Sequence, residues 1–285
     1  MSLIKATNKD EELIQKMDQL LSDKEHYYLC WLGQSGFLLQ WNGKRVLIDP
    51  YLSDSLTKKY DGTDKPHIRM SELVVNPGLL RNISVVTSSH NHTDHLDAET
   101  LIPVLKNNPG IKFIIPEANR DFVAERVKIE KGLPIGLNDG GSVTVDGFTF
   151  HGIPAKHNEI ERDEKANCRF MGYVISFGNY NIYHSGDTLL FDDMIRLLKP
   201  FTVDVAILPI NGDDPARNVA GNLNYKEAVV LAKAIDAKML IPCHYDMFSF
   251  NTADVDLFSD EAKKEGQPYK ILQGGEIIQA LKLLV

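Results

Sequence analysis

Apolar residues in the first fifty positions change from helical spacing to strand spacing. Leucine, isoleucine and methionine occupy positions 13, 14, 17, 20 and 21, which lie on one face of a helix, so we expect an amphipathic helix over 10–21 within a peripheral N-terminal segment, 1–25. Three short apolar runs then predict strands over 28–32, 37–41 and 45–48. Asn42-Gly43 predicts a hairpin turn between the last two, because both residues tolerate positive φ.

The middle of the chain predicts a long connection followed by alternating strands and helices. Residues 53–79 are polar and contain Gly62, Pro66 and Pro77, so we expect a flap or connection of the kind that often covers active sites. From residue 83 onward the hydrophobic pattern predicts, in order, a strand over 84–88, a helix over 98–106, a strand over 112–115 and a helix over 117–127.

The second half of the chain also predicts strands followed by alternating helices and strands. Alternating residues over 143–153 and 172–184 predict strands, with turns at Asp146-Gly147 and Gly178-Asn179. The later elements are predicted to be helices over 189–198, 225–235 and 253–265 and strands over 203–210 and 237–242. Asn224 and Glu227 have the spacing of a helix N-cap and its reciprocal partner. This order favours one α+β domain over 1–285, with two mixed sheets packed face to face and helices outside.

Composition narrows the function classes. The net charge is −8 over 285 residues and no local basic patch is present, which disfavours nucleic-acid binding and favours a small-molecule substrate. The apolar runs are too short to cross a membrane, and the N-terminus has no secretory signal, so we expect a cytoplasmic protein without a membrane partner. Cys30, Cys168 and Cys243 are odd in number and far apart, which argues against a disulfide framework.

A dense run of metal-ligand side chains follows the predicted strand 84–88. Residues 90–95 read His-Asn-His-Thr-Asp-His, which places three of the nine histidines within six positions. Imidazole nitrogens and carboxylate oxygens together suit zinc, iron or manganese, and a loop at a strand end can direct alternate side chains to neighbouring ions. The alternative is a polar surface loop or a pH-sensitive contact.

Four further short runs end predicted strands with a potential ligand, namely Asp49, His157, Asp187 and His244. Each residue alone has an ordinary structural alternative, such as a strand-end turn for Asp49 or a helix N-cap for Asp187. Together with residues 90–95 and in this order, however, the set resembles the five motifs of the metallo-β-lactamase superfamily over nearly the whole chain. The resemblance implies that superfamily's αββα sandwich.

The resemblance also implies two divalent ions per chain, Zn²⁺ or Mn²⁺ in preference to iron. It assigns one ion to His90, His92 and His157, the other to Asp94, His95 and His244, with Asp187 as the bridge. Asp49 would orient a ligand histidine by a hydrogen bond. Two such ions lower the pKa of a shared water from about 15.7 toward about 7, so a metal-bound hydroxide would be the nucleophile and Asp94 would also carry a proton to the leaving group.

The second half points to a substrate. Residues 208–212, 217–224 and 241–252 resemble the branch that contains L-ascorbate 6-phosphate lactonase, which implies hydrolysis of a small sugar-phosphate-like lactone. We expect four substrate contacts, Arg217, Asn218, Asn222 and Tyr245. Each has an alternative: Arg217 pairs with Asp213 or Asp214, the asparagines shape their loop, and Tyr245 packs under the flap. His67 is expected at the surface, and His184 is expected to pack.

Three other functions remain open at this point. A phosphodiesterase would use the same hydroxide and the same ligand set. A protein that binds metal without turnover would be expected to have lost one or more ligands. A di-iron redox enzyme would be expected to have an acidic residue substituted among the ligands and an added flavin domain. The resemblance also makes a homo-oligomer a reasonable expectation.

Overall fold

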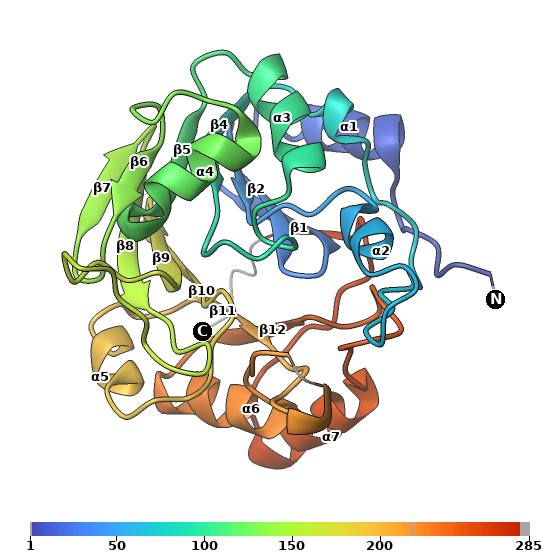
Figure 1. Cartoon of the computed structure of the whole chain (residues 1–285), viewed down its shortest axis with the longest axis vertical. Helices are drawn as coiled ribbons and strands as arrows, with labels where there is room; N and C mark the ends of the chain where they lie inside the picture. The colour runs from blue at the N-terminus through green and yellow to red at the C-terminus, as the bar shows by residue number, and fades with distance from the viewer. Residues whose placement is uncertain (1, 218, 280–285) are drawn as a thin grey trace.

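Two mixed β-sheets pack face to face at the centre of the computed structural model, which describes residues 2–217 and 219–279 (Figure 1). The first sheet has the order β13-β1-β2-β3-β4-β5-β6 and is built from β1 (Tyr27–Gly33), β2 (Gly36–Trp41), β3 (Lys44–Ile48), β4 (Ile83–Thr87), β5 (Lys112–Pro116), β6 (Ile135–Leu137) and β13 (Ile277–Gln279). The second has the order β12-β11-β10-β9-β8-β7 and is built from β7 (Ser142–Val145), β8 (Phe148–Pro154), β9 (Met171–Phe177), β10 (Tyr180–His184), β11 (Val205–Pro209) and β12 (Met239–Cys243).

Helices cover both outer faces, which confirms the predicted α+β sandwich (Figure 1). The first sheet is covered by α1 (Asp10–Gln19), α3 (Ala98–Asn107) and α4 (Arg120–Val127), and the second by α5 (Met194–Leu198), α6 (Tyr225–Ala234) and α7 (Val255–Glu265). A short helix, α2 (Ser55–Lys59), and single 3-10 turns at Pro77–Leu79, Glu117–Asn119 and Pro215–Arg217 lie in connections. Within the described ranges, no helix has the length and apolar character needed to cross a membrane.

The first sheet is buried on both faces. In β1, Leu29 and Trp31 belong to the core between the sheets, whereas Tyr28 and Cys30 belong to the cluster under α1 and α3. Successive side chains of a strand point to opposite faces, so a strand that is covered on both sides reads as a continuous apolar run. This explains why residues 28–32 show no polar alternation.

Strand directions bring the predicted ligand motifs to one edge. β3 is parallel to β4, and β10 is parallel to both β11 and β12 through the sheet. β8 is antiparallel to β9, and β9 is antiparallel to β10, so β8 and β10 also run in the same direction. The segments that follow β3, β4, β8, β10 and β12 therefore all leave at carboxyl ends of strands, where sites of this type form.

The observed elements differ from the predicted ones in three places. The predicted helix 189–198 begins only at Met194, because the backbone N–H of Leu189 donates to the Lys156 carbonyl at 2.7 Å and extends a β-bridge. The three-residue strands β6 and β13 were not predicted. Residues 53–79 contain α2 in addition to irregular chain. The predicted N-cap of α6 is confirmed, since Asn224 and Glu227 form a reciprocal capping box.

Candidate metal centre

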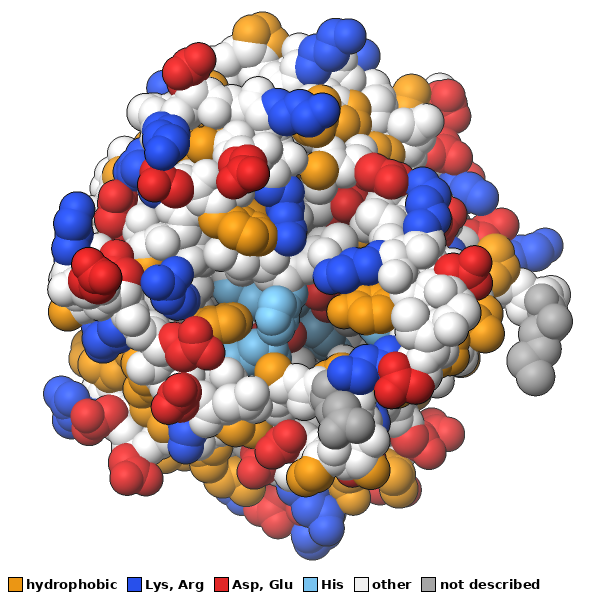
Figure 2. All heavy atoms as spheres, viewed as in Figure 1, with side chains coloured by type: hydrophobic (Ala, Val, Ile, Leu, Met, Phe, Trp, Pro, Cys, Tyr) orange, Lys and Arg blue, Asp and Glu red, His pale blue; other side chains and the backbone are white. Residues whose placement is uncertain are grey.

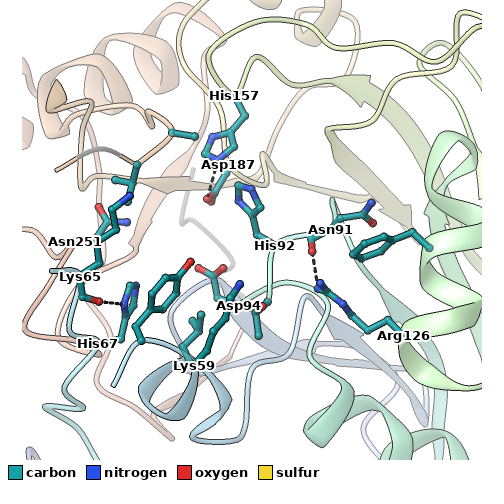
Figure 3. Close-up of a pocket in the computed structure, with 16 residues that line it drawn as sticks. Lys59, Lys65, His67, Asn91, His92, Asp94, Arg126, His157, Asp187 and Asn251 are labelled. Atoms are coloured by element: carbon teal, nitrogen blue, oxygen red, sulfur yellow. Dashed lines mark hydrogen bonds and ion pairs between the residues drawn. The ribbon is translucent and has the colours of Figure 1, made fainter. Parts of the chain in front are cut away.

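Histidine side chains gather on the floor of a hollow in the face shown in Figure 2. They come from the segments that follow β4, β8 and β12, and Asp187 joins them from the segment after β10. In the close-up of Figure 3, His92, Asp94, His157 and Asp187 lie around a common centre. Residues separated by 154 positions in the sequence, from His90 to His244, thus share one site.

The ligand atoms form two groups. One contains His90, His92, His157 and Asp187, the other contains Asp94, His95, Asp187 and His244, and within each group the atoms lie within 4.8 Å of one another. Asp187 belongs to both groups. The division between the two groups is the one that the resemblance implied.

Several of these atoms are buried and lack hydrogen-bond partners, which tests whether the site fits metal ions. The unpartnered atoms are His90 Nε2, His95 Nε2, His244 Nε2 and Asp187 Oδ1. Asp187 Oδ1 lies 2.8 Å from His244 Nε2 and 3.2 Å from His95 Nε2, but with no hydrogen-bond geometry between them. Buried polar atoms are normally hydrogen-bonded, and imidazole with carboxylate is a donor set for zinc or manganese. The residues present fit a pair of divalent ions.

The charges in the site favour ligation. Burial lowers the pKa of His90, His92 and His157, so these imidazoles are neutral near pH 7 and keep a lone pair for a metal. Burial would also lower the pKa of His95, but attraction to Asp187 and Asp94 outweighs it and raises that pKa. Burial would raise the pKa of Asp187, but His244 and His95 outweigh it, so the carboxylate stays ionised.

Asp49 orients one of the ligand histidines. It is fully buried and accepts hydrogen bonds from His95 Nδ1 at 2.8 Å, Thr87 Oγ1 at 2.9 Å and the Ser89 backbone N–H at 3.1 Å. With Nδ1–H of His95 bonded to a carboxylate, Nε2 is left as the ligating nitrogen. This is the contact with a ligand histidine that the sequence analysis expected of Asp49.

Other supporting contacts come from residues that the sequence analysis missed. His157 Nδ1 lies 2.8 Å from the Gly221 carbonyl, and His90 Nδ1 lies 3.0 Å from Ser89 Oγ. Phe170 packs against three ligand rings, with centroid separations of 5.1 Å to His90, 5.9 Å to His92 and 5.3 Å to His157. Gln34 contacts both Asp94 and His244. Only Gln34 had a visible sequence signal, the tight Gly-Gln-Ser-Gly turn at 33–36.

Comparison with known proteins agrees with this geometry. The sequence-family model described as the beta-lactamase superfamily domain matches residues 28–244 of this chain. This chain belongs to the β-lactamase superfamily. A UPF0173 metal-dependent hydrolase of Saccharolobus solfataricus is 29% identical over 253 residues, which is 88% of this chain and 98% of the relative. One of Methanoculleus marisnigri is 30% identical over 224 residues, covering 77% of this chain and 81% of the relative. An isothiocyanate hydrolase from Delia radicum gut bacteria shares the fold, with a TM-score of 0.69, 18% identity and coverage of 88% and 98%.

The superfamily site opens into a cleft of about 430 Å³. Its floor includes His92, Asp94, His157 and Asp187, and the connection 53–79 supplies one wall through Leu56, Lys59, Tyr60, Lys65 and His67. His67 was predicted at the surface; it lies on the surface of the cleft, half-buried against Tyr60 and Phe248. Figure 3 shows Lys59 and Lys65 on the side of the cleft opposite Arg126.

The predicted substrate contacts lie elsewhere or have other partners. The Tyr245 hydroxyl is buried, donates to the Leu272 carbonyl at 2.5 Å, and its ring stacks on Trp31 away from the cleft, so it is not available to an oxyanion. Arg217 donates to the carbonyls of Asn211 and Gly212 at 2.9 and 2.7 Å. These bonds replace both the predicted contact with substrate and the alternative ion pair with Asp213 or Asp214.

The two predicted asparagine contacts have different outcomes. Asn222 is buried and its side-chain nitrogen donates to Asn211 Oδ1 at 3.1 Å, so it shapes the loop, as the alternative interpretation held. Asn218 lies outside the described residues. Neither Asn222 nor Arg217 lines the cleft.

Proposed function

We propose that this chain is a metal-dependent hydrolase that opens a small, negatively charged lactone of the sugar-phosphate type. The observation that carries the proposal is the sharing of Asp187 by two adjacent ligand groups, which suits two ions side by side. When bound, two such ions lower the pKa of the water between them and polarise the substrate oxygen. The names of the curated relatives, metal-dependent hydrolases, support hydrolysis as the reaction class.

The protein's own residues supply orientation and proton transfer. Burial keeps His90, His92 and His157 neutral for ligation, and Asp49 fixes the ring of His95. Asp94 is the acidic ligand best placed to move a proton, because 17% of its side chain is exposed and it lies on the cleft floor. A carboxylate at this position can accept a proton from water and return it to the leaving group.

Cationic side chains around the cleft support an anionic substrate. Lys59, Lys65 and Arg126 all line it, although the chain as a whole is acidic. Arg126 is held in place by a 2.6 Å hydrogen bond to the Asn91 carbonyl and by packing over Phe122, with 4.4 Å between the guanidinium carbon and the ring centroid. A fixed guanidinium pays little entropy when it binds a phosphate or carboxylate. The lactone itself is supported by the resemblance of residues 208–252 to the lactonase branch.

A substrate panel tests the proposal. Protein loaded with Zn²⁺ or Mn²⁺ is assayed on sugar lactones, phosphorylated sugar lactones and phosphodiesters, and we expect turnover to be highest on the phosphorylated lactones. Asp94→Asn is expected to lose most of this turnover. Turnover confined to phosphodiesters would replace the lactone proposal by the phosphodiesterase, which the same cations would also suit. Full turnover with both ions retained in Asp94→Asn would refute the proton-transfer role.

The cationic wall is tested separately with neighbouring lysines. Lys59→Met is expected to raise KM for a phosphorylated lactone several-fold more than for its uncharged analogue, because it removes a charge from the cleft. Lys58→Met is the matched control, since Lys58 pairs with Glu99 at 2.8 Å and does not line the cleft. Equal effects of the two substitutions would show that the cleft charge does not select the substrate.

A further inference from the structure

Asn251 lines the cleft next to the wall formed by the connection 53–79 (Figure 3). Its neighbour Phe250 packs against His67 of that wall, with 5.3 Å between the ring centroids. The backbone of Asn251 has a positive φ of 58°, a conformation that asparagine adopts more readily than most residues. The Asn251 side chain therefore lies beside the cationic wall of the cleft.

Two donors fix the side-chain oxygen of Asn251. Arg217 Nη1 donates to Asn251 Oδ1 at 2.7 Å, and Asn211 Nδ2 donates to the same oxygen at 2.9 Å. A guanidinium group only donates hydrogen bonds, so the Asn251 atom that faces Arg217 is the oxygen and not the nitrogen. The orientation of this amide is therefore determined by the chemistry of its partner.

The amide nitrogen of Asn251 is the side-chain atom left for the cleft. Arg217 and Asn211 do not line the cleft, so the oxygen that they hold is turned away from it. Across residues 2–217 and 219–279, no group accepts a hydrogen bond from Asn251 Nδ2, which carries two hydrogens. The Asn251 side chain thus offers a hydrogen-bond donor, and not an acceptor, to a molecule in the cleft.

Arg217 is anchored so that it holds the amide in this orientation. Its Nη2 donates to the carbonyls of Asn211 and Gly212 at 2.9 and 2.7 Å, while Nη1 is used for Asn251. Asn222 supports the same loop through a 3.1 Å hydrogen bond to Asn211 Oδ1. A donor that is fixed before binding loses little conformational entropy when a ligand arrives.

We propose that Asn251 determines specificity by donating a hydrogen bond from Nδ2 to a phosphate oxygen of the substrate, and that Arg217 positions this amide without contacting the substrate. The cations that line the cleft attract an anion from any direction, whereas a hydrogen bond to a charged acceptor is directional as well as strong. A fixed amide beside the cationic wall therefore selects where the phosphate lies. The inference rests on the proposed function only in taking an anionic substrate in this cleft.

Binding of glucose 6-phosphate to zinc-loaded protein, measured by calorimetry, tests the inference without requiring turnover, and glucose is the uncharged reference. Asn251→Gly removes the amide and accepts the positive φ of this position. We expect it to weaken binding of glucose 6-phosphate about 10–100-fold, the effect of one hydrogen bond to a charged group, and to leave binding of glucose nearly unchanged. Asn251→Asp keeps an acceptor for Arg217 and Asn211 but turns a negatively charged oxygen toward the cleft, so it should weaken binding of glucose 6-phosphate at least as much.

Arg217→Met tests the positioning role. It should weaken binding of glucose 6-phosphate in the wild-type background and have little further effect in the Asn251→Gly background, because its contribution passes through the amide. A full additional loss in the double variant would overturn the positioning role, since Arg217 would then act independently of Asn251.

Asn82 supplies the matched control, because it has the same φ of 58° and directly precedes β4, away from the cleft. Asn82→Gly and Asn82→Asp should keep wild-type affinity. Wild-type affinity in both Asn251 variants, or no preference of the wild type for glucose 6-phosphate over glucose, would overturn the inference even if the substrate panel shows lactone hydrolysis. Amide-dependent binding of glucose 6-phosphate by a protein that opens no lactone would instead overturn the proposed function and leave the inference intact.

Discussion

Replacement of Asp49 by asparagine isolates the contribution of the hydrogen bond that orients His95. The substitution keeps size and burial but exchanges a charged acceptor for an amide, whose nitrogen meets either the Nδ1–H of His95 or the backbone N–H of Ser89. A hydrogen bond to a charged group contributes about 1.5–3 kcal/mol, and about 1.4 kcal/mol corresponds to a factor of ten in affinity. We therefore expect the ion held by Asp94, His95 and His244, called the second ion, to bind about 10–100-fold more weakly. Removing a residue that orients a metal-binding histidine usually has an effect of this size.

The assay is a titration of chelator-treated protein with Zn²⁺ against a chromophoric chelator. The ion held by His90, His92 and His157, called the first ion, serves as an internal reference. Its ligands His90, His92 and His157 make no hydrogen bond to Asp49 within the described structure, so its affinity should stay within a few-fold of wild type. Thr87→Val is the matched control, because it removes a 2.9 Å hydrogen bond to Asp49 without touching His95. It should reduce stability by about 1–2 kcal/mol and leave both affinities nearly unchanged. Wild-type affinities in Asp49→Asn, or equal weakening of both ions, would refute the orienting role.

Three further predictions concern stability. Because burial holds the pKa of His90, His92 and His157 below the ordinary 6.5, the unfolded chain binds more protons than the folded chain below that pH, so calorimetry of chelated protein should give a lower Tm at pH 5.5 than at pH 6.5. The raised pKa of His95 acts in the opposite direction, but mainly above pH 6.5, and a higher Tm at pH 5.5 than at pH 6.5 would contradict this prediction. Arg45→Met should cost about 2 kcal/mol in urea unfolding, since it removes the buried donor that bonds Gln40 and Asp18 at 2.7 Å each, and an unchanged midpoint would be inconsistent with this. Zinc at about 100 times its Kd should stabilise the protein by about 2.7 kcal/mol per occupied site, and chelation should reverse the shift; a Tm insensitive to both would rule out binding at these sites.

The metal ligands could be predicted because each of them lies in a short, recognisable sequence pattern. Residues 90–95 stand out by density alone, and Asp49, His157, Asp187 and His244 each follow an apolar run that ends a strand. Parallel strand directions then bring these ends to one edge, so a correct strand order was sufficient to place them together. The αββα arrangement followed from the same order and from the resemblance.

The supporting contacts were not predictable because they join distant segments through atoms that carry no signature. The Gly221 carbonyl that orients His157 is 64 positions away, and a backbone carbonyl has no residue preference. Tyr245 misled for the related reason that adjacency to His244 in sequence says nothing about direction. The chain bends at His244, which has a positive φ of 63°, and the Tyr245 ring packs on Trp31.

The contacts of the connection 53–79, which forms one wall of the cleft, were not predicted from the sequence either. They join this wall directly to the metal centre. The connection 53–79 is joined to the segment after His244 by two backbone hydrogen bonds, Met70 to Met247 at 2.8 Å and Ser249 to Ile68 at 2.9 Å. Arg69 packs over the Phe248 ring, with its guanidinium carbon 5.7 Å from the centroid. The segment that lines the cleft and the segment that carries a metal ligand are therefore one packed unit, so substitutions in either should alter both substrate binding and the second ion site.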